Sequence, residues 1–359
     1  MGRKRFSKII IINLGIMSVL VLLVELMLGA WIFPANGLKF HGVLPNMDEQ
    51  FEVSMFTETP ITINHTRDWY GLRGLSTFNQ PQKIDILTVG GSTTFQKYID
   101  DKDTWQEHLE AKLRTAEKGL TVSNAGLNGH STYAHIKSFD TWFSTIQGLK
   151  PSFILFYIGV NDFLPRSILM EEDGGGSWLK STLQDNSIVY NTMRRIKGAL
   201  MAKEIGFENL MVDFSKYEYT TDSLLTKEYH EFYLDEFVPA FKSRVQKLID
   251  LSVDMGAEPV FITQPMLFYR LKDGILSGVD FARHDFVTGQ AVNGVDSYNM
   301  ITHLNDAIRE VCGQKYRVVE LTSLPVWEQE DFHDWIHNTP MGAKKVADEI
   351  WKQLGDYLK

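Results

Sequence analysis

The sequence predicts an α/β protein in which a mainly five-stranded parallel sheet lies between two layers of helices. Short apolar runs alternate with amphipathic stretches from Ile84 onward, which is typical of this class. The runs are apolar almost throughout, as expected of parallel strands buried on both faces. A third observation concerns the chain outside this domain. Residues 9–33 form an apolar segment long enough to cross a bilayer, so one transmembrane helix is expected before the α/β domain.

The expected strands are five runs rich in apolar residues, at 84–90, 120–126, 151–159, 258–265 and 316–324. Helices are expected at 104–116, at 133–149 and from about Gly342 onward, because apolar residues recur there at helical spacing. One connection is longer than the alternation requires. This insertion, at about 163–257, holds two helical patterns, near 187–205 and 224–255, and either covers the carboxyl ends of the strands or adds surface helices.

Composition limits the classes of function. The chain has 359 residues, 44% hydrophobic and 23% charged, as in a globular protein with a sizeable core. The formal charge is −9 and no basic stripe lies outside the extreme N-terminus, which argues against nucleic acid as a partner. Cys312 is the only cysteine, so an internal disulfide is impossible, although this leaves the compartment open. No cofactor is expected.

The N-terminus predicts a membrane anchor. Residues 1–8 carry four basic side chains, and only Asn13 and Glu25 interrupt the apolar segment that follows. The basic flank predicts a cytoplasmic N-terminus and an extracytoplasmic catalytic domain, periplasmic or at the cell surface. A cleaved signal peptide is the alternative, but the segment is longer than usual for one and lacks a clear cleavage site. Glu25 either faces a partner helix or is tolerated.

Residues 34–83 show no sustained periodicity, and we interpret them as a membrane-proximal connection that packs on the main domain. The main domain then occupies 84–359. Its first strand ends in Gly90, Gly91 and Ser92. Glycines permit a sharp turn and a close backbone approach, and Ser92 would stand at the sheet edge where α/β proteins bind ligands. The same three residues are also compatible with an ordinary turn in which the serine caps a helix.

Candidate partners for a nucleophilic serine occur at three further places. Such a serine needs a general base, an acid that orients the base, and donors for the oxyanion. Gly129 follows the second strand and could offer its N–H, although Gly126 could take its place. Asn161 ends the third strand. Asp334 and His337 precede the last helix, three residues apart, so that the carboxylate can fix the imidazole tautomer.

In this order, Ser92, Gly129, Gly159-x-Asn161-Asp162 and Asp334-x-x-His337 resemble the blocks of the SGNH hydrolases, the GDSL esterase/lipase superfamily, in its membrane-anchored bacterial type. The resemblance covers about 84–357, and Gly91 stands where the family usually has aspartate. It implies a flavodoxin-like fold with Ser92 as nucleophile, His337 as base and then acid, and Asp334 as its orienting acid. It also implies an oxyanion hole formed by the N–H groups of Ser92 and Gly129 and by the Asn161 side chain.

Other polar residues near these blocks have less certain roles. We expect four residues to contact the substrate: Gly91, His130, Asp162 and Gln264. Asp331 and His333 repeat the acid-then-histidine pattern beside Asp334, but their spacing matches no familiar ligand set, so no metal is expected. Asp331 is expected to be solvated. The aromatic residues of 332–337 either pack in the core, which we expect, or stack on a sugar.

These residues predict a serine esterase that removes O-acyl groups, with acetyl as the expected group, from an extracytoplasmic polysaccharide or glycan. Acyl transfer to a glycan would use the same acyl-serine. A lysophospholipase or lipase is a further alternative, which the lack of a long apolar face in the insertion disfavours. A non-catalytic glycan-binding subunit of a polysaccharide synthesis complex is the alternative from another class, but such a protein has no need of all four blocks.

Overall fold

The computed structural model describes residues 2–29, 31, 43, 45–57, 59–163, 182–183, 186–190, 192–193, 211–284, 289–322 and 327–358. At its centre lies a five-stranded sheet of order β12-β7-β5-β3-β4, in which every pairing is parallel. Counted along the chain this order is 5-4-3-1-2, the flavodoxin-like arrangement. The predicted strands are all confirmed, with trimmed ends: β3 (Ile86–Gly90), β4 (Val122–Asn124), β5 (Phe153–Tyr157), β7 (Glu258–Ile262) and β12 (Arg317–Val319).

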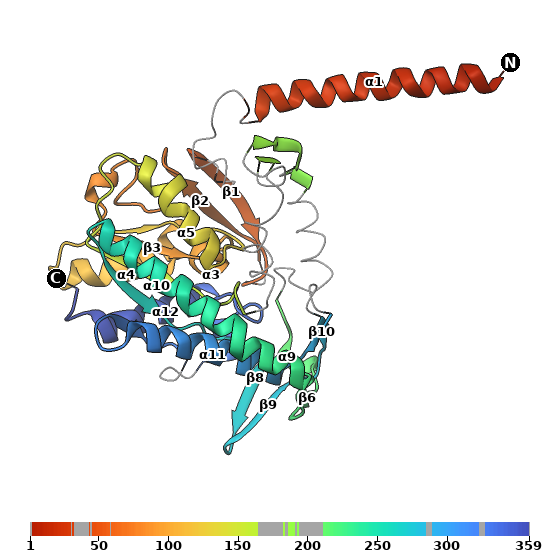
Figure 1. The fold of residues 1–359 in the computed structure, drawn as a ribbon. Helices are drawn as coiled ribbons and strands as arrows, with labels where there is room; N and C mark the ends of the chain where they lie inside the picture. The colour runs from red at the N-terminus through yellow and green to blue at the C-terminus, as the bar shows by residue number, and fades with distance from the viewer. Residues whose placement is uncertain are drawn as a thin grey trace.

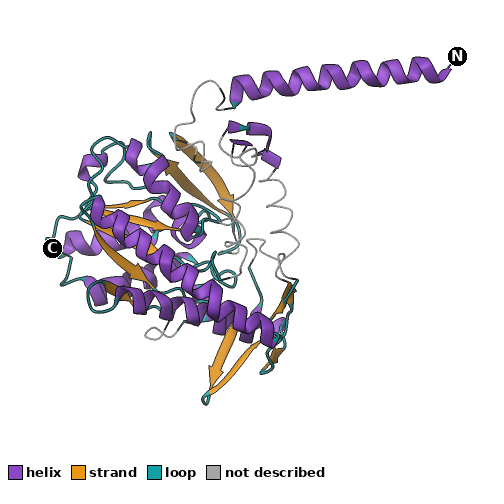
Figure 2. Cartoon of the chain, in the orientation of Figure 1, coloured by secondary structure: helices purple, strands orange, loops and turns teal. Residues whose placement is uncertain are grey.

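Helices cover both faces of the sheet and complete the predicted three layers (Figures 1 and 2). One face is covered by α4 (Trp105–Thr115) and α12 (Pro340–Leu354). The other is covered by α5 (Thr132–Thr141), α10 (Val238–Asp254) and α11 (Gly294–Cys312). Each face has its own apolar cluster, and burying one such large side chain contributes about 1.5–3 kcal/mol. The clusters include Trp105, Leu109, Val346 and Ile350 on the first face and Phe139, Leu248, Leu304 and Ile308 on the second.

Local signals explain where some helices begin and end. The Thr339 side chain caps α12 and Pro340 occupies its first turn. The helix expected over 133–149 ends early, at Thr141, and Phe143–Thr145 forms the 3-10 turn η3. The fully buried Trp142 turns inward at this point and its indole N–H donates to the carbonyl of Tyr70, 2.7 Å away. Helix α11, with its Asn293 capping box, was not predicted.

The long connection after β5 holds the crossover helix of the fold. The expected helix near 187–205 lies largely outside the described residues, although 188–190 and 192–193 are helical. The second pattern forms α9 (Lys227–Phe232), the π-helical turn η6 (Tyr233–Phe237) and α10. Because α10 packs against α5, α11 and β7, the expectation of a cap is wrong for this part of the insertion.

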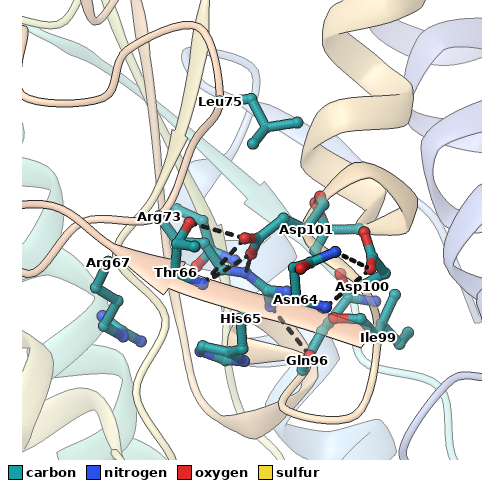
Figure 3. A network of polar contacts seen from close by, with 12 residues as sticks. Asn64, His65, Thr66, Arg67, Arg73, Leu75, Gln96, Ile99, Asp100 and Asp101 are labelled. Atoms are coloured by element: carbon teal, nitrogen blue, oxygen red, sulfur yellow. Dashed lines mark hydrogen bonds and ion pairs between the residues drawn. The ribbon is translucent and has the colours of Figure 1, made fainter. Parts of the chain in front are cut away.

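The segment interpreted as a connection contains an antiparallel hairpin, β1 (Met47–Val53) and β2 (Ile61–Arg67). It packs on the main domain through two carboxylates (Figure 3): Asp100 accepts from the N–H of Asn64 at 2.8 Å, and Asp101 from that of Thr66 at 3.0 Å. The prediction missed the hairpin because most side chains of β1 are exposed and give no apolar alternation.

Short strands and turns complete the described structure. The hairpin of β8 (Tyr269–Lys272) and β9 (Ile275–Val279) projects from the body in Figure 1 and pairs with β6 (Tyr219–Thr220). Strands β10 (Arg283–His284) and β11 (Ala291–Val292) form a further pair. The remaining elements are α3 (Ser92–Phe95), η1 (Pro81–Lys83), η2 (Asp101–Asp103), η5 (Phe214–Lys216) and η7 (Gln329–Asp331).

The N-terminal helix α1 (Gly2–Leu28) extends away from the body of the molecule (Figure 1). Near its end, the Glu25 carboxylate accepts hydrogen bonds from Ser187 Oγ at 2.5 Å, from the N–H of Val189 at 3.1 Å and from Trp31 Nε1 at 2.8 Å. Glu25 therefore contacts another segment of the same chain, at Ser187 and Val189. Among the described residues, we find no helix whose length and apolar character would let it span a membrane. The anchor stays a prediction.

Candidate active site

The turn after β3 needs both of its glycines. A Cβ on Gly90 would overlap the Thr94 side chain and the Tyr157 carbonyl, and a Cβ on Gly91 would overlap Nδ2 of Asn161. Because both residues lack a side chain, the end of the neighbouring strand, β5, packs directly against this turn. The Asn161 amide does the same. Ser92 follows as the first residue of α3 and is partly exposed at the carboxyl edge of the sheet.

Ser92, His337 and Asp334 form one hydrogen-bonded chain. The distance between Ser92 Oγ and His337 Nε2 is 2.7 Å, and that between His337 Nδ1 and Asp334 Oδ2 is 2.6 Å. The second carboxylate oxygen of Asp334 accepts from the N–H groups of Ile336 at 2.9 Å and His337 at 2.8 Å. With the imidazole proton held on Nδ1 by the carboxylate, Nε2 is the acceptor for the Ser92 hydroxyl.

Asp334 stays ionised although it is almost fully buried. Burial alone would raise its pKa, but the charge and hydrogen bond of His337 and the N–H of Ile336 outweigh burial and lower the pKa to about 2. The carboxylate is therefore negative at every pH near neutrality, and it can stabilise an imidazolium that forms on His337.

Asn161 and the loop that carries Gly129 lie near this turn. Asn161 Nδ2 lies beside Gly91 and donates one hydrogen to the carbonyl of His130 at 3.0 Å, which leaves its second hydrogen for another acceptor. Gly129 has a left-handed φ of +71° and open space at its α-carbon. Gly126 is unsuitable as the alternative donor, because its N–H already donates to Asn124 Oδ1 at 2.7 Å.

Two of the expected substrate contacts are wrong. Asp162 is 1% exposed, and its carboxylate accepts from the N–H of Thr132 at 3.1 Å and from the Thr132 hydroxyl at 2.6 Å. Arg244 lies 3.7 Å from the same carboxylate, so Asp162 holds the start of α5 in place. Gln264 is fully buried, with its side-chain oxygen 3.4 Å from Thr93 Oγ1. Both residues stand at strand ends, but their side chains point into the protein.

The other two expected substrate contacts stay predictions. Gly91 makes room for the Asn161 amide, as described above. His130 is partly buried beside Gly129, and its ring centroid lies 5.8 Å from that of His135. Burial, together with the positive charge of Arg67, lowers the pKa of His130 to about 4, so its ring is neutral at pH 7.

Asp331 is buried, in contrast to the solvated side chain that we expected. Its carboxylate accepts from the N–H of Glu328 at 2.9 Å and pairs with Lys345 Nζ at 2.5 Å, and it thereby ties η7 to α12. These contacts do not involve His337, which is hydrogen-bonded to Asp334 instead. The aromatic Trp335 packs on Phe214, 5.0 Å between centroids, and on Phe268, 4.8 Å, as the packing interpretation expects.

His333 is buried against the imidazole of His337. Its ring stacks on His337 at 5.6 Å between centroids, with the planes 10° apart. Burial lowers the pKa of His333 to about 4, so it is a neutral neighbour of the base. Phe56, from the loop between β1 and β2, and Tyr98 make T-shaped ring contacts with His333, at 5.5 and 6.4 Å between centroids.

His333, Asp334 and His337 also form the one group of three potential metal ligands found among the described residues, with ligand atoms within 4.8 Å of one another. Both ring nitrogens of His337 are hydrogen-bonded, to Asp334 and to Ser92. An ion bound by His337 would have to replace one of these bonds. The geometry therefore favours a catalytic triad over a metal site.

The sequence interpretation missed the contribution of the β1–β2 hairpin to this site. Besides Phe56, the hairpin supplies His65 and Arg67, which are buried on the same face of β2 as Ile63. The alternation of these three positions is the signal that could have found them. It went unnoticed because two of the three inward residues are polar.

Comparison with known proteins finds similarity to solved structures. No family model and no curated protein matches the sequence. Many solved structures do match. They include the acetylxylan esterase Axe2 from Geobacillus stearothermophilus (12% identity, TM-score 0.42, covering 75% of this chain and 93% of that one). The esterase EstA from Pseudoalteromonas sp. is 10% identical, with a TM-score of 0.41 and coverage of 76% and 97%.

A GDSL-like lipase from Bacteroides thetaiotaomicron also matches, at 12% identity and a TM-score of 0.37, covering 77% of this chain and 88% of that one. Because identities of 10–14% do not define an activity, we base the function on the geometry of the site itself.

Proposed function

We propose that this protein is an SGNH-type serine hydrolase that cleaves carboxylic esters through an acyl-serine intermediate. The hydrogen-bonded chain from Ser92 Oγ through His337 to Asp334 carries this proposal. Ser92 lies 245 residues before His337 in the sequence, yet it meets the His337–Asp334 pair in the order that nucleophile, base and orienting acid require. A binding protein has no need of this geometry.

The arrangement explains a two-step reaction. His337 Nε2 takes the proton of Ser92 as Oγ attacks the ester carbonyl, and Asp334 stabilises the imidazolium. The N–H groups of Ser92 and Gly129 and the Asn161 amide stabilise the negative oxygen of the tetrahedral intermediate. The imidazolium then gives its proton to the leaving alcohol. Water, activated by His337 in the same way, releases the carboxylic acid and restores Ser92.

The substrate that we propose is an O-acetylated polysaccharide outside the cytoplasm. Phe56 and Tyr98 place aromatic rings beside His333, which stacks on His337, and aromatic surface next to a few polar groups suits a compact ligand such as a sugar ring. We further propose that residues 9–33 anchor the chain in the membrane, with residues 1–8 in the cytoplasm and the catalytic domain outside.

A chain-length series tests the acyl preference. The full-length protein, purified in detergent, would be assayed with p-nitrophenyl acetate, butyrate, octanoate and laurate, with Ser92→Ala as the inactive control. We expect kcat/KM to fall steeply from acetate onward, because the residues beside the base are aromatic rings and polar groups and form no long aliphatic channel in the described structure. Equal or greater activity on laurate would replace the glycan proposal with a lipase.

A polymeric substrate extends the test. Acetylated xylan would be incubated with the protein, and free acetate would be measured together with acetyl groups newly attached to an added oligosaccharide. Hydrolysis predicts free acetate that depends on Ser92. Acetyl groups that appear on the acceptor sugar in place of free acetate would instead identify a transferase.

A further inference from the structure

Arg67, the last residue of β2, is a buried cation that no carboxylate neutralises directly. Only 2% of the residue is exposed, and in the described structure no carboxylate oxygen lies within ion-pair distance of it. Figure 3 shows its side chain pointing away from Asp101, which pairs with Arg73 at 2.5 Å. Burial and the charge of Arg73 lower the pKa of Arg67 to about 9, which leaves the guanidinium charged at neutral pH.

Burying such a charge costs several kcal/mol unless its donors are satisfied. Arg67 satisfies them with main-chain oxygens. Its guanidinium donates to the carbonyl of Gly71 and, at 2.8 Å, to that of Gly126, and it lies 4.7 Å from the centre of the Phe95 ring. The planar fork of arginine can make these contacts together, whereas lysine cannot.

These contacts join α3, which carries Ser92, to the segment that carries Gly129. Phe95 ends α3, the short helix that begins with Ser92. Gly126 begins the segment 126–130, the oxyanion loop, which carries Gly129. The far end of this loop is held by Asn161, which donates to the carbonyl of His130 at 3.0 Å. Arg67 and Asn161 therefore fix the loop at its two ends.

The charge of Arg67 also acts on the oxyanion loop. It contributes to the lowered pKa of His130, the neighbour of Gly129. A positive potential that disfavours a proton on His130 favours a negative oxygen in the same region.

We propose that Arg67 is a positioning residue of the active site, which holds the oxyanion loop against the nucleophile helix and supplies a positive potential to the oxyanion. This inference rests on the proposed ester hydrolysis. It makes the β1–β2 hairpin part of the catalytic unit, whereas a purely structural role would confine the effect of Arg67 to folding.

The test compares Arg67→Lys, which keeps the charge but loses the fork, with Arg67→Met, which loses both. Because a displacement of about 1 Å at a reacting centre can cost ~10²-fold in rate, we expect kcat on p-nitrophenyl acetate to fall about 10- to 100-fold, more for Met than for Lys. KM should stay within about twofold, since the oxyanion exists only beyond the ground state. Arg317→Lys is the matched control, because Arg317 lies over the Tyr357 ring at the opposite, amino end of the sheet.

A second readout separates positioning from folding. Phenylboronic acid forms a tetrahedral anion on an active serine, and its affinity should fall in parallel with kcat/KM in the Arg67 variants. Rates would be referred to active sites titrated with a fluorophosphonate. If kcat per titrated site and boronate affinity are unchanged, and only the melting temperature falls, the positioning role is wrong.

Should Arg67→Met fail to fold, Phe95→Leu removes the ring beneath the guanidinium and leaves both carbonyl contacts. We expect a smaller fall in kcat, again at constant KM, and an unchanged kcat would contradict the proposal. The wild type provides the separate check on the proposed function. If it shows no Ser92-dependent ester hydrolysis, the hydrolase assignment fails, whereas an active wild type with fully active Arg67 variants overturns only the inference about Arg67.

Discussion

The Asn161 side chain allows the proposed stabilisation of the oxyanion to be tested by removing a single amide group. It is fixed by the carbonyl of His130 and by contact with Gly91, and only one of its amide hydrogens is engaged. We expect Asn161→Ala to lower kcat by about 10²–10³, the loss typical of removing one oxyanion donor. KM should change little, because the bond strengthens in the transition state.

Steady-state kinetics on p-nitrophenyl acetate measure both parameters. Asn293→Ala is a suitable control, since Asn293 is also buried but caps α11, and its loss should cost about 1 kcal/mol of stability without a fall in kcat. An increase in KM alone for Asn161→Ala would make Asn161 a substrate-binding residue and leave the oxyanion to other donors.

The two aspartates of 331–337 have different partners, and this predicts different defects. Asp334→Asn removes the charge that holds the His337 tautomer, so kcat should fall by up to ~10⁴ while the fold is kept. Asp331→Asn weakens the contact with Lys345 and should lower the melting temperature while kcat stays within a few-fold of wild type.

Circular dichroism melts and initial rates, measured on the same preparations, give the comparison. The opposite ranking of the two variants, with both folded, would mean that Asp331 orients His337 in the working enzyme. A smaller loss in Asp334→Asn is compatible with the triad if it still exceeds that of Asp331→Asn, because other contacts can hold the ring.

At the scale of elements, the local patterns that predicted the sheet are those that parallel strands must have. Strands such as β5 are buried on both faces and are therefore apolar at every position, which can be read without any partner. The hairpin β1–β2 has the opposite character: its inward positions on β2 include His65 and Arg67, whose partners lie elsewhere in the chain. A local sequence pattern cannot predict that a polar residue is buried when its burial depends on carbonyl groups elsewhere in the chain.

The same limit explains the mixed outcome at the candidate site. Ser92, Asp334 and His337 could be placed because strand ends and loops at one sheet edge must converge. Asp162 and Gln264 stand at equivalent positions, yet their side chains turn inward, toward Thr132 and Thr93. The position of a residue at a strand end fixes the edge it occupies but leaves the direction of its side chain to packing. Helix α11 was missed although its Asn293–Asp296 capping box is visible in the sequence.

For the whole molecule, the proposed anchor predicts on which side of a membrane the proposed catalytic domain lies. Four basic residues precede the apolar segment 9–33, and α1 is helical through most of that segment. Glu25, near the end of α1, accepts hydrogen bonds from Ser187 and Val189. Because the end of α1 thus contacts residues 187–189 of the insertion, an anchored α1 would hold this part of the insertion close to the membrane, on the side opposite residues 1–8.

A reporter fused after Lys359 tests this arrangement. Basic residues beside an apolar segment favour its cytoplasmic side. We therefore expect a fused alkaline phosphatase, which is active only outside the cytoplasm, to be active. A fused green fluorescent protein, exported through the general secretory route, should be dark.

Replacing Arg3, Lys4, Arg5 and Lys8 with alanine should lower the phosphatase signal, because it removes the charge asymmetry that orients the helix. Replacing four lysines on the outer surface of the catalytic domain, Lys227, Lys242, Lys315 and Lys352, is the matched control and should leave the signal unchanged. A fluorescent fusion with inactive phosphatase would place the domain in the cytoplasm and remove extracytoplasmic polysaccharide as the substrate, while the ester hydrolysis assigned to Ser92 would still stand.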